Sequence, residues 1–222
     1  MPSTTSRPRR RSVPLSKERL IAATIEILDA EGEDALPFRT LAAHLSTGPG
    51  AIYHHVASKA ELLMSAASRV ISVAIDGSSG EQNPVAALRA TASAVFDAID
   101  AHPWIGAQLT REPWQLAVVQ MLEAFGRIFR ELGVAKLAQF NTASTLVHYV
   151  LGLAGQYAAG ARTLGSRTDR EAFLLGVTEQ WRQLDASTYP FVHSVAEGFE
   201  QHDDRKQFLA GVDVILAGAL SR

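Results

Sequence analysis

The sequence of 222 residues contains no cysteine, and this excludes disulfide bonds, thiolate metal sites and cysteine nucleophiles. Aromatic residues are also scarce, at 7%, although 47% of the residues are hydrophobic and Ala, Leu and Val are abundant. Packed helices suit this composition better than a sheet, because strands are rich in aromatic and β-branched residues. We therefore expect an all-α fold, and a reducing cytoplasm is the expected location.

Charge is missing from one long stretch, residues 137–161. The stretch is long enough to span a membrane, but it contains seven polar side chains that are costly in lipid. Other helices can satisfy such groups, so the central helix of a soluble bundle is the favoured interpretation and no membrane contact is expected. A secretory signal is not expected either, because charged residues follow the arginine-rich start.

Catalytic motifs are absent as well. The sequence has no Gly-rich phosphate loop, no nucleophile elbow, no His-Glu-x-x-His pattern and no paired carboxylates in an apolar setting. Its seven histidines are scattered, and the adjacent His54 and His55 would point about 100° apart on a helix. We therefore expect no enzyme, no cofactor and no bound metal.

The net charge of −2 is unevenly distributed along the chain. Residues 1–59 hold eight Lys and Arg against six Asp and Glu, so this part carries +2 and the remainder −4. An excess of positive charge at one end is expected where only that end contacts a polyanion.

Three regions follow from the pattern of apolar residues and helix caps. Residues 1–15, rich in Ser, Thr, Arg and Pro, indicate a disordered basic arm. Residues 16–62 predict three short helices, and residues 63–222 predict a helical bundle. In the bundle we expect helices at about 58–75, 84–101, 103–109, 113–132, 136–161, 170–184, 191–201 and 204–219.

Residues 16–62 have the layout of a helix-turn-helix. A first helix begins after the cap Ser16 and ends at Gly32, with Ile21, Ile25 and Leu28 on its apolar face. A second helix is expected at about 38–45, with Leu41 and Leu45 facing inward. A third begins at Gly48-Pro49, a favourable helix start, and ends near residue 55. The next helix opens with a capping box, Ser58 to Glu61.

The segment Leu15–Leu63, which includes FRTLAAHLSTGPGAIYHHVASKAELL at residues 38–63, resembles the DNA-binding domain of the TetR family. Ala42, Leu45, the turn, Ile52-Tyr53, His55-Val56 and Lys59 follow in the family's order and spacing. The C-terminal stretch from Tyr189-Pro190 through Gly211-Val212-Asp213 to Leu220 also resembles the ending of the tetracycline-repressor-like subgroup. This resemblance implies a regulator that binds a near-palindromic DNA operator as a homodimer and responds to a small-molecule effector.

The chemistry of the recognition region fits this expectation. Small residues at the start of the third helix allow close approach to base edges, and Tyr53 and His54 suit phosphate oxygens. Tyr53 has an alternative as a half-buried core aromatic. Lys59 opposes the helix dipole, a conflict that an external phosphate would resolve, although a solvated lysine is the alternative. The expected DNA-binding residues are Arg39, Thr47, Gly48, Pro49, Gly50, Ala51, Tyr53, His54 and Lys59.

Three positions depart from the family pattern. Pro37 replaces the usual hydroxyl cap of the second helix, Ser46 replaces the common turn glycine, and Thr47 replaces an apolar residue. The turn is therefore expected to be slightly looser. Since the recognition helix offers few side chains for direct base readout, the arginine cluster Arg7–Arg11 is a candidate for the minor groove.

The long uncharged helix suggests a sensor. Its polar residues recur at nearly whole helical turns, so they form a stripe that either lines a ligand cavity or faces solvent or neighbouring helices. The candidate ligand-binding residues are Trp104, Gln108, Trp114, Phe125, Asn141, Thr145, Tyr149, Gln156 and Trp181. For those outside the uncharged helix, a place in the core is the more common role of such residues.

The resemblance also implies how a dimer forms and responds. The last helix and the uncharged helix would form a four-helix interface, with Gly152, Gly155, Ala158 and Ala159 allowing close crossing. Ligand binding would move the helix that begins at Lys59 and thereby change the spacing of the recognition helices. Repression is the expected sign of regulation, with activation as the alternative. The alternatives are control by a protein partner and, less in keeping with the motifs, a helical-bundle enzyme.

Overall fold

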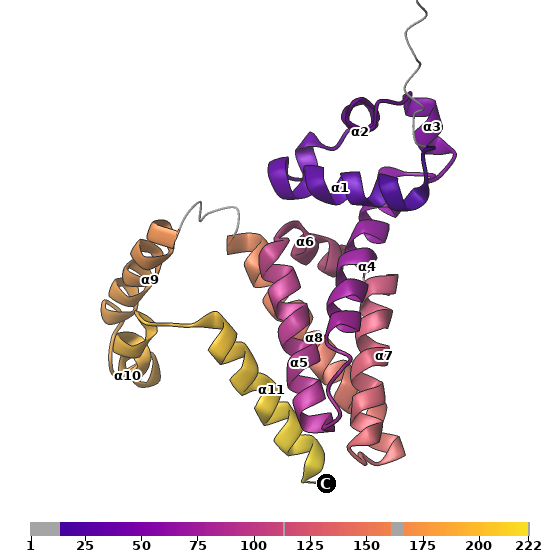
Figure 1. The fold of residues 1–222 in the computed structure, drawn as a ribbon. Coiled ribbons are helices and arrows are strands. Elements are labelled where there is room, and N and C mark those ends of the chain that lie inside the picture. The colour runs from indigo at the N-terminus through magenta and orange to yellow at the C-terminus, as the bar shows by residue number, and fades with distance from the viewer. Residues whose placement is uncertain (1–13, 113, 161–166, 222) are drawn as a thin grey trace, which may run out of the picture. The chain divides into compact units, whose positions relative to one another are not determined.

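The computed structural model describes residues 14–112, 114–160 and 167–221, and every regular element within these ranges is a helix (Figure 1). The predicted all-α fold is thus confirmed. The chain divides into two compact units, one up to Leu62 and one from Leu63 onward. The arginine cluster at residues 7–11 lies outside the described residues.

The first unit contains four helical elements and the first turn of a fifth. These elements are α1 (Lys17–Glu31), the 3₁₀ helix η1 (Glu33–Ala35), α2 (Phe38–His44), α3 (Pro49–Tyr53) and the start of α4 (Lys59–Gly77). Ser16 Oγ caps α1 by accepting a hydrogen bond from the Arg19 amide at 3.3 Å. Gly32 ends α1 with a positive φ of 78°, a conformation that glycine adopts without a steric penalty.

The core of this unit comes from one face of each helix. Leu20, Leu41, Ile52 and Leu62 are fully buried, and Ile27 is nearly so. Burial of each such side chain contributes on the order of 1.5–3 kcal/mol, so α1, α2, α3 and α4 are held around one apolar centre.

One expectation for this unit needs correction, and one short element was not predicted. Ile21 and Ile25 are only half-buried, because the face of α1 that turns inward is offset by one residue and consists of Leu20, Ala23, Thr24, Ile27 and Leu28. Both sets have helical spacing, so periodicity alone did not separate them. The short helix η1 was not predicted, since three residues carry no periodic signal.

The second unit is a bundle built around α7 and α8. Besides the rest of α4, its helices are α5 (Pro84–Ala101), α6 (Trp104–Arg111), α7 (Leu116–Glu131), α8 (Lys136–Gly160), α9 (Arg167–Arg182), α10 (Pro190–Phe199) and α11 (Asp204–Leu220). α8 packs against α6 and α7, and α7 packs against α5. The largest fully buried side chains in this core are Phe125 and Phe129 of α7.

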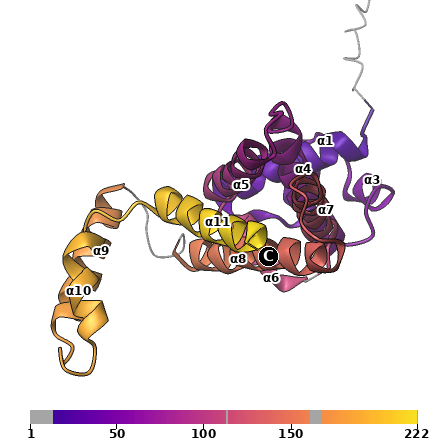
Figure 2. The same ribbon diagram turned by 90° about the horizontal axis from the view of Figure 1, so that it is seen from below.

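The last helix, α11, lies alongside α5 and α8 (Figure 2). Its buried face consists of Phe208, Val212 and Leu216. Two ion pairs join α11 to α5: Arg89 Nε lies 2.7 Å from Asp213 Oδ1, and Arg205 Nε lies 2.9 Å from Asp97 Oδ1. These pairs are about half exposed, so apolar burial contributes more to this contact than the charges do.

The helices α9 and α10 pack against each other. Trp181 and Phe199 form the aromatic contact between them, with ring centroids 4.5 Å apart, and Arg182 pairs with Glu200 at 2.6 Å. Arg170 of α9 also reaches Asp204 at the start of α11, at 2.7 Å. Within the residues that the structure describes, no helix has both the length and the apolar character needed to cross a membrane.

Candidate nucleic-acid interface and sensor region

The turn between α2 and α3 is closed by backbone hydrogen bonds. The Ser46 amide donates to the Ala43 carbonyl at 3.1 Å, and the Thr47 amide donates to the Ala42 carbonyl at 2.9 Å. Ser46 adopts φ 51°, the one positive φ at a non-glycine position among the described residues. The turn therefore has the left-handed conformation that explains why glycine is usual here, and Ser46 accepts it at a cost in strain.

The start of α3 combines an exposed outer side with one anchor into the core. Gly48, Pro49 and Gly50 are exposed, whereas Ile52 is fully buried beneath them. A methyl group in place of the hydrogen on Gly48 or Gly50 would meet no atom of another part of the protein within 4 Å. The outer side of α3 is therefore uncovered and narrow, a shape suited to entry into a major groove.

Tyr53 is 60% exposed and is braced by Phe38 of α2. The two ring centroids are 4.9 Å apart and the planes meet at 64°, an edge-to-face contact. Because the ring is held at its base and exposed at its end, Tyr53 is not a core aromatic. Its neighbour His54 and the α2 residue Arg39 are also exposed.

Lys59 is less exposed than the sequence suggested. Its Nζ donates a hydrogen bond of 2.9 Å to the Glu33 carbonyl of η1, and the side chain is part-buried. A neutral carbonyl satisfies one of three ammonium donors but does not neutralise the charge. The cation is thus held in a fixed position at the start of α4, with donors left for a phosphate.

Glu61 connects the start of α4 to the start of α1. Its Oε2 accepts from the Ala57 amide at 2.8 Å, and its Oε1 lies 3.2 Å from Lys17 Nζ. Ser58 Oγ accepts from the Glu61 amide at 3.1 Å, which completes the predicted capping box. The hydrogen bond from Ala57, followed by the contact with Lys17, lowers the pKa of Glu61. Since Lys17 and Glu61 are 44 residues apart, no local sequence pattern predicts this pair.

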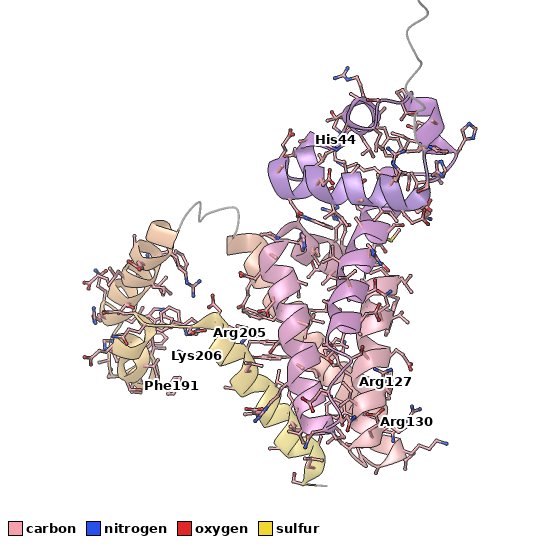
Figure 3. All side chains as sticks on the ribbon, in the orientation of Figure 1. His44, Arg127, Arg130, Phe191, Arg205 and Lys206 are labelled. Atoms are coloured by element: carbon pink, nitrogen blue, oxygen red, sulfur yellow. The ribbon has the colours of Figure 1, made fainter. Side chains whose placement is uncertain are left out.

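The first unit thus brings the predicted contact residues onto its helix-turn-helix: Arg39 on α2, residues 47–54 at the turn and on α3, and Lys59 at the start of α4. Thr47 and Ala51 are half-buried. His44 of α2, which is labelled in Figure 3, has its Nε2 3.1 Å from Glu26 Oε2 of α1.

The candidate sensor residues do not meet in one place. The stripe on α8 faces outward, because Asn141, Thr145 and Gln156 are exposed and the Thr145 hydroxyl donates to the Asn141 carbonyl at 2.7 Å. This corresponds to the solvent-facing alternative rather than to a buried stripe. α8 is apolar around most of its circumference, so its own sequence did not determine which side turns inward.

The aromatic and amide candidates are scattered through the second unit. Phe125 is fully buried and Gln108 is 3% exposed, whereas Trp114 is 72% exposed. Trp104 is half-buried, and Trp181 packs on Phe199 between α9 and α10. Gln108 and Phe125 therefore belong to the interior of the bundle, and Trp114 does not.

A buried amide at the corner between α6 and α7 was missed. Gln115 Nε2 donates to the Gln108 carbonyl at 2.6 Å and to the Glu112 carbonyl at 3.2 Å, which caps the last turn of α6. Its Oε1 is buried and accepts no hydrogen bond from the described residues. The sequence could not predict this burial, because it depends on packing against α6 and a Gln in a loop is usually exposed.

Tyr149 is the member of the polar stripe that makes a tertiary contact. Its ring stacks on Phe208 of α11 with centroids 5.4 Å apart, and its hydroxyl donates to the Phe208 carbonyl at 3.3 Å. Partial burial raises the pKa of the Tyr149 phenol. Gly211 permits this contact, because a methyl group there would overlap the Tyr149 ring and hydroxyl.

The first unit has an exposed third helix, a tyrosine braced by Phe38 and a lysine held by a hydrogen bond, and α4 continues from it into a helical bundle. This arrangement is that of a helix-turn-helix regulator. Residues 20–66 match the family described as bacterial regulatory proteins, tetR family, and residues 79–222 match the tetracyclin repressor-like C-terminal domain. The chain belongs to the tetR family of bacterial transcriptional regulators.

Three proteins illustrate this similarity. The transcriptional regulator SCO7222, a TetR from Streptomyces coelicolor, is 42% identical and has a TM-score of 0.82, with 94% of this chain and 99% of that chain covered. The HTH-type transcriptional repressor DrrR1 from Streptomyces coeruleorubidus is 28% identical over 196 residues, covering 86% of this chain and 73% of that protein. ActR from Streptomyces coelicolor, solved in complex with actinorhodin, shares the fold at 23% identity, with a TM-score of 0.75 and coverage of 94% and 96%.

Proposed function

We propose that this protein is a homodimeric repressor that leaves its DNA operator when a small molecule binds the helical bundle. The observation that carries the proposal is the exposed surface of α3: Tyr53 is 60% exposed, while the adjacent Ile52 is fully buried. A helix that is anchored in the core on one side and exposed to solvent on the other can enter a major groove without first breaking contacts within the protein.

The proposed DNA contacts fall into two groups. Arg39, Tyr53, His54 and Lys59 supply donors for phosphates or base edges, and residues 47–51 supply a narrow surface for close approach. Lys59 is the best-positioned of these residues, because its hydrogen bond to the Glu33 carbonyl fixes the place of its charge. A charge held in advance loses less conformational entropy when a phosphate arrives.

A homodimer is proposed because large apolar side chains remain uncovered on two neighbouring helices. Leu137 and Phe140 of α8 are 96% and 60% exposed, and Val214 of α11 is 72% exposed. An operator with twofold symmetry requires two recognition helices about 34–36 Å apart, which a symmetric pair of chains supplies.

A small-molecule effector is proposed because the interior of the bundle is apolar with few polar groups. Phe125 and Gln108 are the members of the candidate set that lie inside. The repressor name of DrrR1 and the actinorhodin complex of ActR support the same proposal. α4 would transmit the response, since it carries Lys59 at one end and belongs to the bundle at the other. A coupling on the order of 1–3 kcal/mol is sufficient.

The test begins with selection of bound duplexes from random DNA by the full-length protein. Tyr53→Phe removes one hydroxyl and Lys59→Gln removes one charge. As a control, Arg130→Gln on α7 removes an exposed charge that lies outside both the proposed DNA contacts and the proposed dimer surface. We expect Lys59→Gln to weaken binding uniformly across sequences and to reduce the salt slope by about 1, and the control to change neither. Unaltered affinity and salt slope in the Tyr53→Phe, Lys59→Gln double variant would contradict the proposed interface.

A further inference from the structure

The hairpin formed by α9 and α10 is a packed element that projects from the bundle. In Figures 1 and 2 it stands apart from α5, α6 and α7. Leu174 and Ala196 are buried within it. At its base, Arg170 lies 2.7 Å from Asp204 Oδ2 of α11, and His202 Nε2 lies 3.0 Å from the other oxygen of the same carboxylate. These contacts hold the hairpin in one direction relative to α11.

Four large apolar side chains are exposed at the far end of the hairpin, and we call them the tip patch. Their exposed fractions are 74% for Phe191, 46% for Tyr189, 39% for Leu184 and 37% for Val195. Phe191, labelled in Figure 3, and Val195 lie one helical turn apart on α10. Since full burial of an aromatic side chain removes about 150–250 Å² from water, the tip patch leaves on the order of 300 Å² of apolar surface uncovered. A patch of this size marks an interaction surface.

The turn that carries the tip patch is fixed by hydrogen bonds. The Thr188 hydroxyl donates to Asp185 Oδ2 at 2.7 Å, and the Tyr189 amide donates to the Asp185 carbonyl at 2.9 Å. His193 Nε2 of α10 lies 2.6 Å from the Leu184 carbonyl, which joins the turn to the first turns of the helix. A surface that is ordered in advance loses less conformational entropy when a partner binds it.

The start of α8 is a second apolar surface that its own chain leaves uncovered. Leu137 is 96% exposed, and Phe140, one turn later, is 60% exposed. Residues 137–160 carry no charge, so Lys136 determines the charge at this end of α8. Neither Lys136 nor Asp185, which follows Leu184 of the tip patch, forms an ion pair with a described residue. The two surfaces are therefore complementary in charge and alike in apolar character.

A second copy of the chain supplies both surfaces at once. A stable interface takes about 20–30 residues and about 800 Å² from each partner. The proposed dimer surface on α8 and α11 exposes three such large side chains, Leu137, Phe140 and Val214, and the tip patch adds four more. In a twofold pair each chain gives one tip patch and receives one, so the same contact occurs twice.

We propose that the tip patch of one chain docks on the start of α8 of a second copy, with Phe191 packing against Leu137 and Phe140 and with Asp185 facing Lys136. The inference rests on the proposed function for the homodimer and adds the surfaces through which the two chains hold each other. α9 and α10 are then an arm that each chain lays on its partner.

Disulfide trapping tests the contact directly, because the chain contains no cysteine of its own. Full-length Phe191→Cys and Leu137→Cys chains, co-expressed with different tags and oxidised after purification, should form a disulfide between the two kinds of chain. A disulfide requires Cα atoms within about 7 Å, so only neighbouring positions react efficiently. Val73→Cys, at a residue of α4 that is 50% exposed, replaces Leu137→Cys in the control and should give no such product.

The dissociation constant of the dimer, measured by analytical ultracentrifugation, tests the energetics. Phe191→Ser should raise it at least tenfold, because a buried aromatic anchor is lost from both copies of the contact. Lys136→Glu should raise it about twofold to fivefold, as expected for exposed charges. Phe173→Ser is the matched control, since Phe173 is 46% exposed on α9 but lies outside the tip patch. Thermal unfolding confirms that each variant is folded.

A dimer that forms no Phe191→Cys to Leu137→Cys disulfide, or whose dissociation constant is unchanged by Phe191→Ser, would overturn the proposed contact. Operator binding by the same proteins separates this failure from that of the proposed function. If the disulfide forms and Phe191→Ser weakens the dimer but no duplex binds, the proposed function fails and the contact stands. If the dimer binds its operator and both tests of the contact are negative, the contact fails and the proposed function stands.

Discussion

Ser46 shows how one residue of the helix-turn-helix is constrained by its backbone. Its φ of 51° lies in the left-handed region, where a side chain meets the adjacent backbone and glycine does not. We expect Ser46→Gly to stabilise the first unit by about 0.5–1 kcal/mol, since relief of strain exceeds the added flexibility of the unfolded chain. Chemical denaturation measures this difference.

Ser93→Gly, within α5, is the matched control for Ser46→Gly. Here glycine replaces serine in a helix interior, so the same substitution should destabilise the protein. A lower midpoint for Ser46→Gly than for the parent protein would show that the turn does not hold this conformation in solution.

Gly211 is constrained by a neighbouring side chain rather than by its backbone. A methyl group at this position would overlap the ring and hydroxyl of Tyr149. We expect Gly211→Ala to cost about 1–3 kcal/mol of unfolding free energy, because the stacked Tyr149 must leave Phe208. Gly218→Ala on the same helix has open space around it and should have no such effect.

The double variant Gly211→Ala, Tyr149→Ala tests the cause of that loss. Removing the ring removes the overlap, so the added cost of the glycine substitution should largely disappear. If the losses of unfolding free energy from the two single substitutions simply add in the double variant, the overlap with Tyr149 is not the cause of the loss at Gly211.

At the scale of elements, local sequence patterns predicted most helices. The features that were missed depend on contacts between residues distant in the sequence. Ser16 and the Ser58 to Glu61 box marked helix starts because a cap acts on backbone groups only two or three residues away. The pair of Lys17 and Glu61 joins residues 44 positions apart, and no local pattern encodes such a contact. The sequence left open whether the polar stripe of α8 lines a cavity or faces solvent, because a helix that is apolar on most sides shows no preferred inner face.

The loop between α9 and α10 is organised by one carboxylate. Asp185 accepts hydrogen bonds from the Thr188 and Ser187 hydroxyls, each at 2.7 Å, and from the Ser187 amide at 3.1 Å. These bonds, the one from Thr188 foremost, lower the pKa of Asp185 from 3.8 to about 2. Since the folded state has the lower pKa, these bonds stabilise the loop above pH 3.8 and this contribution is lost as the pH falls to about 2.

We expect the carboxyl carbon of Asp185, followed by NMR, to titrate with a midpoint near 2. In a Ser187→Ala, Thr188→Ala variant the midpoint should rise, because the hydroxyl donors are gone. A midpoint at the ordinary value of 3.8 in the unmodified chain would show that the loop is not closed by this carboxylate.

At the scale of the whole molecule, the uncovered face of α11 bears on assembly. The opposite face of this helix is buried and joined to α5 by two ion pairs, so α11 cannot cover its outer residues by rotating. Val214 is 72% exposed in the single chain. Val214→Asp should therefore leave the folded chain intact, yet place an unpaired charge inside any interface formed by α11.

We expect Val214→Asp to weaken the dimer by on the order of 3 kcal/mol, which is a roughly hundredfold rise in its dissociation constant. Analytical ultracentrifugation measures this change, and operator affinity should fall with it because a monomer presents one recognition helix. Leu116→Asp, at a residue of α7 that is 61% exposed, is the control and should leave the dimer unchanged. A Val214→Asp protein that remains dimeric at the concentrations where the parent does would exclude α11 from the interface.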